Sequence, residues 1–262
     1  MIANYHTHTS RCKHAVGTDE EYVKAAIARG VKILGFSDHA PFIYPNNYSS
    51  FYKMETYELR DYFDSLLSLR EKYKDKIEIH IGLEVEYYEN IFHESLALWR
   101  NFPVEYFILG HHILYNEYDE SRIGSIVYTE SDELLFEYTD KVVKGLETGR
   151  FSILAHPDII NYHGNMNIYR DAMEKIIITA KKTDVPLEYN ILGMRAKRIY
   201  PRDEFWKLAR ELSAPVIIGC DSHDPRDVGT PEEYDMARAN LRALGITPLD
   251  IIELKNPLFF KE

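Results

Sequence analysis

The chain has 262 residues, of which 45% are hydrophobic, and a formal net charge of −11 at pH 7. This composition predicts an ordinary globular protein, which we expect to be a single domain over residues 1–262. The acidic balance argues against nonspecific nucleic-acid binding, because such proteins need a basic surface. It still permits a small anionic substrate if bound divalent ions reverse the local charge. Two cysteines are too few for a disulfide framework, and no apolar run reaches the roughly 18–20 residues of a membrane-spanning helix, so a cytoplasmic protein without a membrane partner is expected.

Short apolar runs alternate with amphipathic stretches along the chain. Thr18 and Glu21 have the spacing of a capping box at a helix start, and Gly30 is placed to end that helix. Strands that alternate with helices predict βαβ units and a parallel sheet, and seven units in this length favour a closed barrel. The strands are expected near 2–7, 32–37, 77–85, 104–110, 152–156, 186–190 and 215–220. The helices are expected near 18–30, 55–74, 89–101, 129–149, 168–183, 203–212 and 231–244.

Two connections between these elements are long. Residues 40–54 and 111–128 both carry turn residues and aromatic side chains, so both are candidate active-site loops. Residues 249–254 fit either a late helix or a late strand, and the sequence does not decide between them.

Histidines and acidic residues fall at the ends of six of the seven predicted strands. His6 and His8 end the first strand, and their spacing places both side chains on the same face. In such α/β barrels the carboxyl ends of the strands gather at one rim, and that rim carries the active site. We therefore expect an α/β fold with the site at this rim. Imidazoles and carboxylates in this ratio suit Zn, Mn or Fe as the metal. There are more of these side chains than one ion can bind, which predicts a site with several ions. Eight of the eleven histidines lie there: His6, His8, His14, His39, His111, His112, His156 and His223.

The same motifs resemble the PHP (polymerase and histidinol phosphatase) superfamily. They follow the family's order from position 6 to 223, and the resemblance implies a distorted (β/α)7 barrel with three divalent metal ions. Within the superfamily, residues 12–15 and 36–41 resemble the histidinol-phosphate phosphatase branch. The motifs are His6-Thr7-His8 with His14, Ser37-Asp38-His39, Gly82-Leu83-Glu84, Gly110-His111-His112, Ala155-His156-Pro157 and Asp221-Ser222-His223.

The resemblance also implies a set of metal ligands. Glu84 is expected to bridge the first and second ions. His112 is preferred as a ligand over His111, which would then lie behind the metals or face the substrate. Asp38 is expected to orient His39 or a neighbouring imidazole, or else to fill a turn or capping role. The first ion would take His6, His8, Glu84 and Asp221; the second Glu84, His112 and His156; and the third His14, His39 and His223.

Phosphoryl transfer needs positioning and neutralisation of negative charge more than covalent help from the protein. We therefore expect a metal-bridging hydroxide to attack phosphorus in line, and Asp221 or a nearby histidine such as His223 to protonate the leaving oxygen. Arg195 lies in a stretch that resembles the family's Asn-…-Gly-x-Arg segment, and its guanidinium is the expected phosphate clamp. Arg198 and Lys197 are its neighbouring alternatives.

One departure from the family pattern concerns the substrate. Many relatives carry a basic residue shortly after the His-Pro-Asp stretch, and residues 158–163 contain no arginine or lysine. Arg11, Lys13 or His163 are candidates to replace it. An amine and an imidazole of the substrate could be received by Asp158, by Glu86 or by the tyrosines of residues 40–54.

The predicted function is a metal-dependent phosphomonoesterase that hydrolyses L-histidinol phosphate in histidine biosynthesis. Three alternatives remain open from the sequence. The first is a PHP phosphoesterase for another small phosphorylated substrate, such as a nucleotide, phosphotyrosine or an oligonucleotide end. The second is a non-catalytic metal-binding module. The third is an amidohydrolase-like barrel, which the position of Glu84 and the final Asp221-Ser222-His223 motif fit less well.

Overall fold

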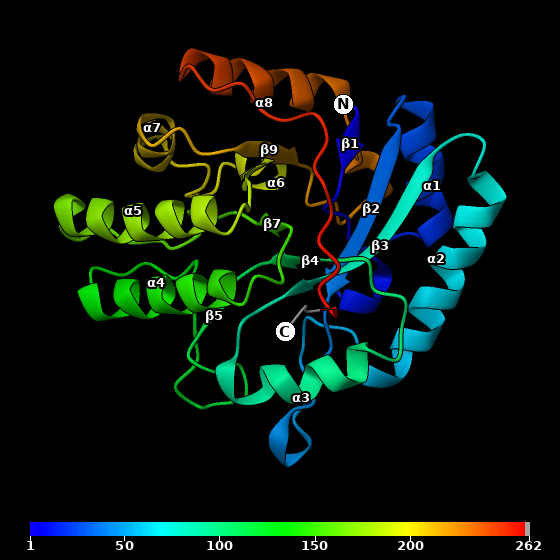
Figure 1. The fold of residues 1–262 in the computed structure, drawn as a ribbon, viewed down its shortest axis with the longest axis horizontal. Helices are drawn as coiled ribbons and strands as arrows, with labels where there is room; N and C mark the ends of the chain where they lie inside the picture. The colour runs from blue at the N-terminus through cyan, green and yellow to red at the C-terminus, as the bar shows by residue number, and fades with distance from the viewer. Residues whose placement is uncertain (260–262) are drawn as a thin grey trace.

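The computed structural model describes residues 1–259. Its main sheet has seven parallel strands in the order β1-β2-β3-β4-β7-β8-β9, and the sheet curls into a nearly closed barrel with helices around it (Figure 1). The expected α/β barrel is therefore confirmed, and each predicted strand is present. The strands are β1 (Ala3–Asn4), β2 (Ile33–His39), β3 (Glu78–Val85), β4 (Tyr106–Leu109), β7 (Ile153–Leu154), β8 (Leu187–Asn190) and β9 (Val216–Gly219).

The two edges of this sheet meet just beyond β1 and β9. Thr7 and Ser222 form a parallel bridge there, and the His8 amide donates to the Ser222 carbonyl at 2.9 Å. This contact brings the first and last sequence motifs side by side at the carboxyl ends of the strands.

The seven long helices were all predicted from the sequence. The capping box of the first helix is present, because Thr18 and Glu21 exchange side-chain and backbone hydrogen bonds. Gly30 ends the same helix at a φ of 75°, which glycine adopts without steric penalty. Within residues 1–259, every helix is too short or too polar to cross a lipid bilayer. The long helices are α1 (Asp19–Ala28), α2 (Leu59–Tyr73), α3 (Glu89–Trp99), α4 (Asp132–Glu147), α5 (Met166–Lys182), α7 (Asp203–Glu211) and α8 (Pro231–Ala243).

Several short elements were not predicted, because they contain too few residues for a periodic pattern. The 111–128 connection holds a two-stranded hairpin, and a one-turn helix follows β8. These short elements are β5 (Ile113–Leu114), β6 (Ile123–Gly124), α6 (Ile191–Arg195) and the 3-10 helices Ser10–Cys12, Pro45–Asn47, Thr56–Glu58 and Pro225–Asp227.

The barrel interior is apolar at the amino ends of the strands. Tyr106 lies in this region, and its hydroxyl donates to the carbonyl oxygens of Tyr5 at 2.7 Å and Phe36 at 3.0 Å. Gly35 leaves room for that ring, because a Cβ there would lie 2.4 Å from the Tyr106 hydroxyl. His80 of β3 also lies at this end, beside Tyr5, whereas the candidate metal ligands lie at the carboxyl ends of the strands.

Residues 249–254 form neither a helix nor a strand. The Leu249 amide donates to the Val216 carbonyl at 2.7 Å, and Ile252 and Leu254 pack against the apolar cluster around Tyr106. Figure 1 shows this red segment running from α8 past β1 toward the middle of the sheet. The tail therefore covers the apolar end of the barrel, opposite the candidate site.

Candidate metal centre

The strand ends bring the predicted metal ligands together at one buried place. His6 and His8 are fully buried, and Glu84, His156 and Asp221 are at most 4% exposed. Groups of three or more ligand atoms lie within 4.8 Å of one another, and they include His6–His8–Asp221, His6–Glu84–His156 and His8–His39–His223. The groups overlap, so one continuous cluster of potential ligands occupies the mouth of the barrel.

Four atoms of this cluster are spaced like the ligands of one tetrahedral ion. The Nε2 atoms of His6 and His8 are 3.1 Å apart, and the Asp221 Oδ1 lies 3.6 Å and 3.2 Å from them. The Glu84 Oε2 lies 3.5 Å from each of the same two nitrogens. Ligands bound to zinc at about 2.0–2.1 Å in a tetrahedron would be roughly 3.4 Å apart. These four residues therefore fit the first ion's expected ligand set.

Glu84 faces a second group of ligands with its other oxygen. Its Oε1 lies 3.1 Å from the His156 Nε2 and 3.6 Å from the His112 Nε2. Its Oε2 is buried and accepts no hydrogen bond from the described residues, although the His39 Nδ1 is 3.0 Å away. Leaving a buried carboxylate oxygen without a donor is expensive, and an ion bound at this oxygen would remove that cost. The two oxygens of this carboxylate thus face two groups of candidate ligands, which is the arrangement that the expected bridging role requires.

Electrostatics keep the acidic ligands ionised. Burial opposes ionisation of Glu84, but the imidazoles of His112 and His39 outweigh it and hold the pKa of Glu84 well below its usual range. Burial likewise opposes ionisation of Asp221, and His6 with other histidines holds its pKa well below the usual value. Both side chains therefore offer a negative charge to a cation.

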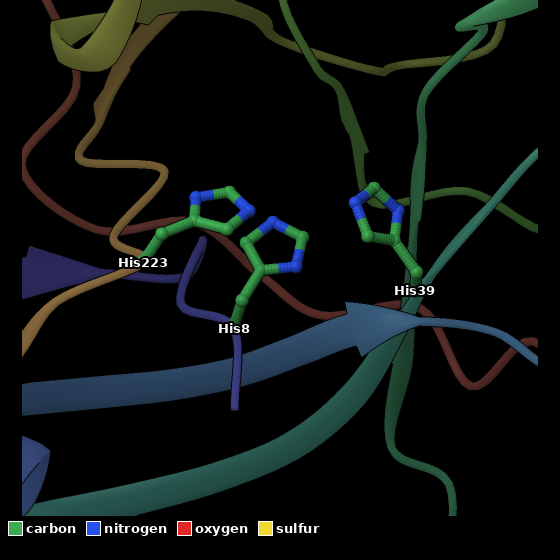
Figure 2. Close-up of side chains that lie close together, drawn as sticks. All are labelled: His8, His39 and His223. Atoms are coloured by element: carbon green, nitrogen blue, oxygen red, sulfur yellow. The ribbon is translucent and has the colours of Figure 1, made fainter. Parts of the chain in front are cut away.

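The third expected ligand set is looser. His39 and His14 have ring centroids 5.3 Å apart, whereas His39 and His8 are 4.4 Å apart. Figure 2 shows His8 between His223 and His39, with His39 at the tip of β2. The His223 Nε2 is buried and makes no hydrogen bond to the described residues, which suits a ligand atom. The geometry thus groups His39 and His223 with His8 more closely than with the exposed His14.

Three imidazoles of the first two sets have a carboxylate at their other ring nitrogen, whereas the buried Nδ1 of His156 makes no hydrogen bond to the described residues. The His6 Nδ1 lies 2.7 Å from the Glu188 Oε1, and the His8 Nδ1 lies 3.2 Å from the Asp38 Oδ1. The His112 Nδ1 lies 3.2 Å from Glu86. A carboxylate behind a ligating histidine is the usual arrangement in metal sites, where it fixes the ring orientation and the tautomer. Asp38 therefore lies behind His8, the neighbouring imidazole, rather than His39.

Glu188 was not singled out from the sequence. It is a buried acid of β8, and with Asn190 of the same strand it contacts the candidate metal ligands. The Asn190 Nδ2 donates to the Glu188 Oε2 at 2.9 Å and to the Asp221 Oδ2 at 3.1 Å. One signal for this pair was available in the sequence. Glu188 is a charged residue inside a predicted buried strand, and a second polar residue follows two positions later.

Two of the candidate ligands have unusual backbone conformations. His156 has a φ of 29° and Asp221 a φ of 51°, which non-glycine residues rarely adopt. Both follow the last residues of a strand, β7 and β9 respectively. Backbone strain at residues that face a cluster of ligands is common in functional sites, because the surrounding structure must impose it.

A cavity of about 700 Å³ opens above the cluster. Arg195 and Arg198 line it, and so do Phe51 and Tyr52 from the first long loop and Ile126 beyond β6. Its polar floor consists of His14, His39, His112, Asp221 and His223. The cavity thus presents the ligand cluster, two cations and an apolar wall to one small molecule, and both long connections contribute to it.

The two arginines are held in different ways. The Arg195 guanidinium forms ion pairs with Asp227 at 2.7 Å and Glu233 at 3.3 Å. The Arg198 guanidinium donates to the Tyr200 hydroxyl at 2.7 Å. Both groups are therefore oriented before any anion binds, and each keeps further N–H donors.

Other predicted substrate contacts lie elsewhere. Arg11 does not line the cavity, because Asp19 and Asp61 hold its guanidinium on the outer side. His111 is buried between the rings of Tyr88 and Tyr138, and burial lowers its pKa to about 4. These two positions correct the expectation that Arg11 and His111 face the substrate.

The two remaining candidates for the missing basic residue also have partners away from the cavity. Lys13 pairs with Glu55 at 2.6 Å. His163 contacts Asn161 at 2.7 Å and stacks on Tyr128. Of the predicted cations, only Arg195 and Arg198 line the cavity.

The chain is similar to proteins of known class over most of its length. It is 26% identical over 246 residues to a probable histidinol-phosphatase of Deinococcus radiodurans. The alignment covers 87% of this chain and 88% of the relative. It is also 26% identical to a histidinol-phosphatase of Bacillus subtilis, with coverage of 89% and 97%.

Solved structures share the fold. A histidinol phosphate phosphatase from Lactococcus lactis, solved with zinc, L-histidinol and phosphate, superposes with a TM-score of 0.73 at 21% identity, covering 96% of this chain and 98% of that one. A family model described as "PHP domain" matches residues 4–191, which is most of the chain and includes every candidate ligand except Asp221 and His223. The chain therefore belongs to the PHP domain family.

Proposed function

We propose that this chain, a phosphoric monoester hydrolase, uses divalent metal ions to hydrolyse L-histidinol phosphate. The observation that carries the proposal is the Glu84 carboxylate, whose two oxygens face two different groups of buried ligands beneath an arginine-lined cavity. Relatives named histidinol-phosphatase support the substrate.

The residues present fit a cluster of ions. The first ion would be held by His6, His8, Asp221 and Glu84, and the second by Glu84, His112 and His156. A third would be held by His39 and His223, with His14 or His8. Such ions, when bound, polarise a phosphoryl group and lower the pKa of a bound water.

The arginines supply the remaining positive charge. A guanidinium offers parallel N–H donors to two phosphate oxygens, and both Arg195 and Arg198 point into the same cavity as the ligands. Since they lie three residues apart on one segment after β8, we propose that Arg198 takes the part of the basic residue missing from residues 158–163.

The leaving oxygen needs a proton, and two groups at the cavity floor are candidates. Asp221 is ionised, so it would first have to accept a proton from the attacking water before passing it on. The Asp221 Oδ1 lies 3.4 Å from the His223 Nδ1, so the two side chains act at the same place. Asp221→Asn keeps the shape of the side chain but removes its charge. Near-normal turnover with normal metal content in this variant would exclude Asp221 from both proton transfer and metal binding.

The organic part of the substrate would contact the cavity walls. Phe51 and Tyr52 offer aromatic surface for an imidazole. Asp224 and Asp227 also line the cavity and offer negative charge for an amine. Glu86 and Asp158 do not line the cavity, and both accept internal donors, among them Lys53 for Glu86 and the Arg202 amide for Asp158.

The test is steady-state hydrolysis of a panel of phosphate monoesters, including L-histidinol phosphate, by protein reloaded with Mn or Zn. We expect a preference for histidinol phosphate of at least about a hundredfold in kcat/KM, or about 2.7 kcal/mol. Removal of metal by a chelator should abolish turnover, and metal should restore it. Uniformly weak turnover would point to another phosphorylated substrate, and metal binding without any turnover would refute catalysis.

Two substitutions test the phosphate clamp. Arg195→Ala and Arg198→Ala should each raise KM by about tenfold or more, because each removes a charge-assisted contact. Arg170→Ala is the matched control, since this arginine pairs with Glu211 on the outside of the barrel. Unchanged kinetics in both cavity variants would refute the clamp.

A further inference from the structure

Glu86, the carboxylate behind His112, belongs to a buried ionic network beside the candidate ligands. Lys53, Glu86 and Glu117 are each at most 1% exposed. The Lys53 Nζ lies 3.1 Å from the Glu86 Oε1 and 2.5 Å from the Glu117 Oε2. Its ammonium group also sits 4.6 Å from the centroid of the Tyr52 ring.

Every carboxylate oxygen of the network has a donor. The Tyr52 hydroxyl donates to the Glu86 Oε1 at 2.6 Å, and the Tyr88 hydroxyl donates to the Glu86 Oε2. At the other end, the Tyr44 hydroxyl donates to the Glu117 Oε2 at 2.6 Å. A buried network of this kind is not an efficient source of stability, because apolar residues of the same volume are often as good or better. Its presence next to a ligand cluster therefore calls for a reason other than packing.

The network connects three separate segments at the site. Tyr52 and Lys53 belong to the first long loop, and Glu86 follows β3, which carries Glu84. Glu117 belongs to the second long connection, which also carries His112. Lys53 contacts both carboxylates and therefore links the three segments.

One oxygen of Glu86 joins the network to the metal site. The Glu86 Oε1 that receives Lys53 is also 3.2 Å from the His112 Nδ1. The opposite nitrogen of the same ring, Nε2, lies 3.6 Å from the Glu84 Oε1. The Tyr52 ring packs edge-on against His39, with centroids 5.2 Å apart. A shift of Glu86 or of Tyr52 would therefore turn a ligand imidazole.

We propose that Lys53 is a positioning residue of the metal centre. It fixes the Glu86 carboxylate, which orients the His112 ring toward Glu84, and it holds Tyr52 against His39. The inference rests on the proposed metal-dependent function, but it concerns the binding of the ions and can be tested without substrate.

The experiment compares three variants in the full chain. Glu117→Gln leaves the contact between Lys53 and Glu86 in place and is the matched control. Lys53→Met keeps an unbranched side chain as far as Cε but removes the ammonium group and with it the contact to Glu86. The double variant Lys53→Met with Glu117→Gln also removes that contact, but it loses one positive and one negative charge together, so it remains informative if the single variant does not fold.

The measurement is the affinity of the apo-protein for Zn, by competition with a chromophoric chelator, beside thermal unfolding and kcat and KM for a phosphate monoester. Loss of a residue that orients a ligand typically weakens metal binding by about 10–100-fold. We expect this loss of affinity for the weakest-bound ion in both variants that carry Lys53→Met, with a larger effect on kcat than on KM. Glu117→Gln should bind the ions with wild-type affinity.

Two results would overturn the inference. One is wild-type affinity in the double variant, and the other is an equal loss of affinity in Glu117→Gln, which would mean that the network only stabilises the fold. Failure of the proposed function is a separate outcome, because the wild-type protein itself would then bind no metal or hydrolyse no phosphate ester.

Discussion

Gly110→Ala should damage the metal centre by moving the bridging carboxylate. A Cβ at residue 110 would lie 2.2 Å from the Glu84 Oε1 and 3.0 Å from the His112 Cε1. An ordinary contact is more than 3 Å, so this oxygen must retreat by about 1 Å. The movement takes it out of reach of the His112 and His156 nitrogens, now 3.6 Å and 3.1 Å away.

The magnitude follows from the role of that oxygen. We expect metal affinity to fall by about 10–100-fold, or about 1.4–2.7 kcal/mol, and turnover by about a hundredfold, since a displacement of 1 Å is enough for that loss. The assay is zinc competition beside hydrolysis of p-nitrophenyl phosphate. Gly30→Ala is the control: its φ of 75° makes alanine strained there, but a Cβ would meet nothing within 4 Å. Gly110→Ala with wild-type affinity and turnover would refute the reasoning.

Three further predictions concern the residues around the site and the fold. Glu188→Gln should weaken metal binding by about 10–100-fold, because it removes the charged acceptor behind His6. The measurement is metal affinity by chelator competition, and an unchanged affinity would contradict the prediction. Hydrogen bonds and ion pairs with two glutamates raise the pKa of His80 in the folded protein. The stabilisation by His80 is therefore complete below the unfolded pKa of about 6.5 and is lost as the pH rises through the higher native pKa. The difference in unfolding free energy between wild type and His80→Gln should be larger at pH 5.5 than at pH 8.5, and the opposite trend would contradict this sign. Ile252→Ala should cost about 1–2 kcal/mol of stability without changing metal content, whereas the exposed Ile251→Ala should be nearly neutral; equal effects in urea titrations would show that the tail does not seal the barrel.

Local signals were sufficient for the architecture. The capping box of Thr18 and Glu21 and the left-handed Gly30 depend on residues within one or two turns, so they were visible in the sequence. Apolar runs of strand length between amphipathic helices predicted each long element, and the parallel sheet followed because βαβ units place consecutive strands side by side. The strand ends then predicted which histidines and acids would gather.

The sequence by itself therefore determined the fold class and most of the ligand cluster, since both depend on short-range pattern and on strand order. Only the tertiary structure decided which group stands behind each ligand and which cations reach the cavity. Glu188 meets His6, Glu117 meets Lys53, and Asp61 helps to hold Arg11 away from the cavity, all through contacts between segments far apart in the chain. No local pattern encodes such pairs, because a side chain's partner is chosen by how the closed barrel packs, and closure itself depends on the meeting of β1 with β9.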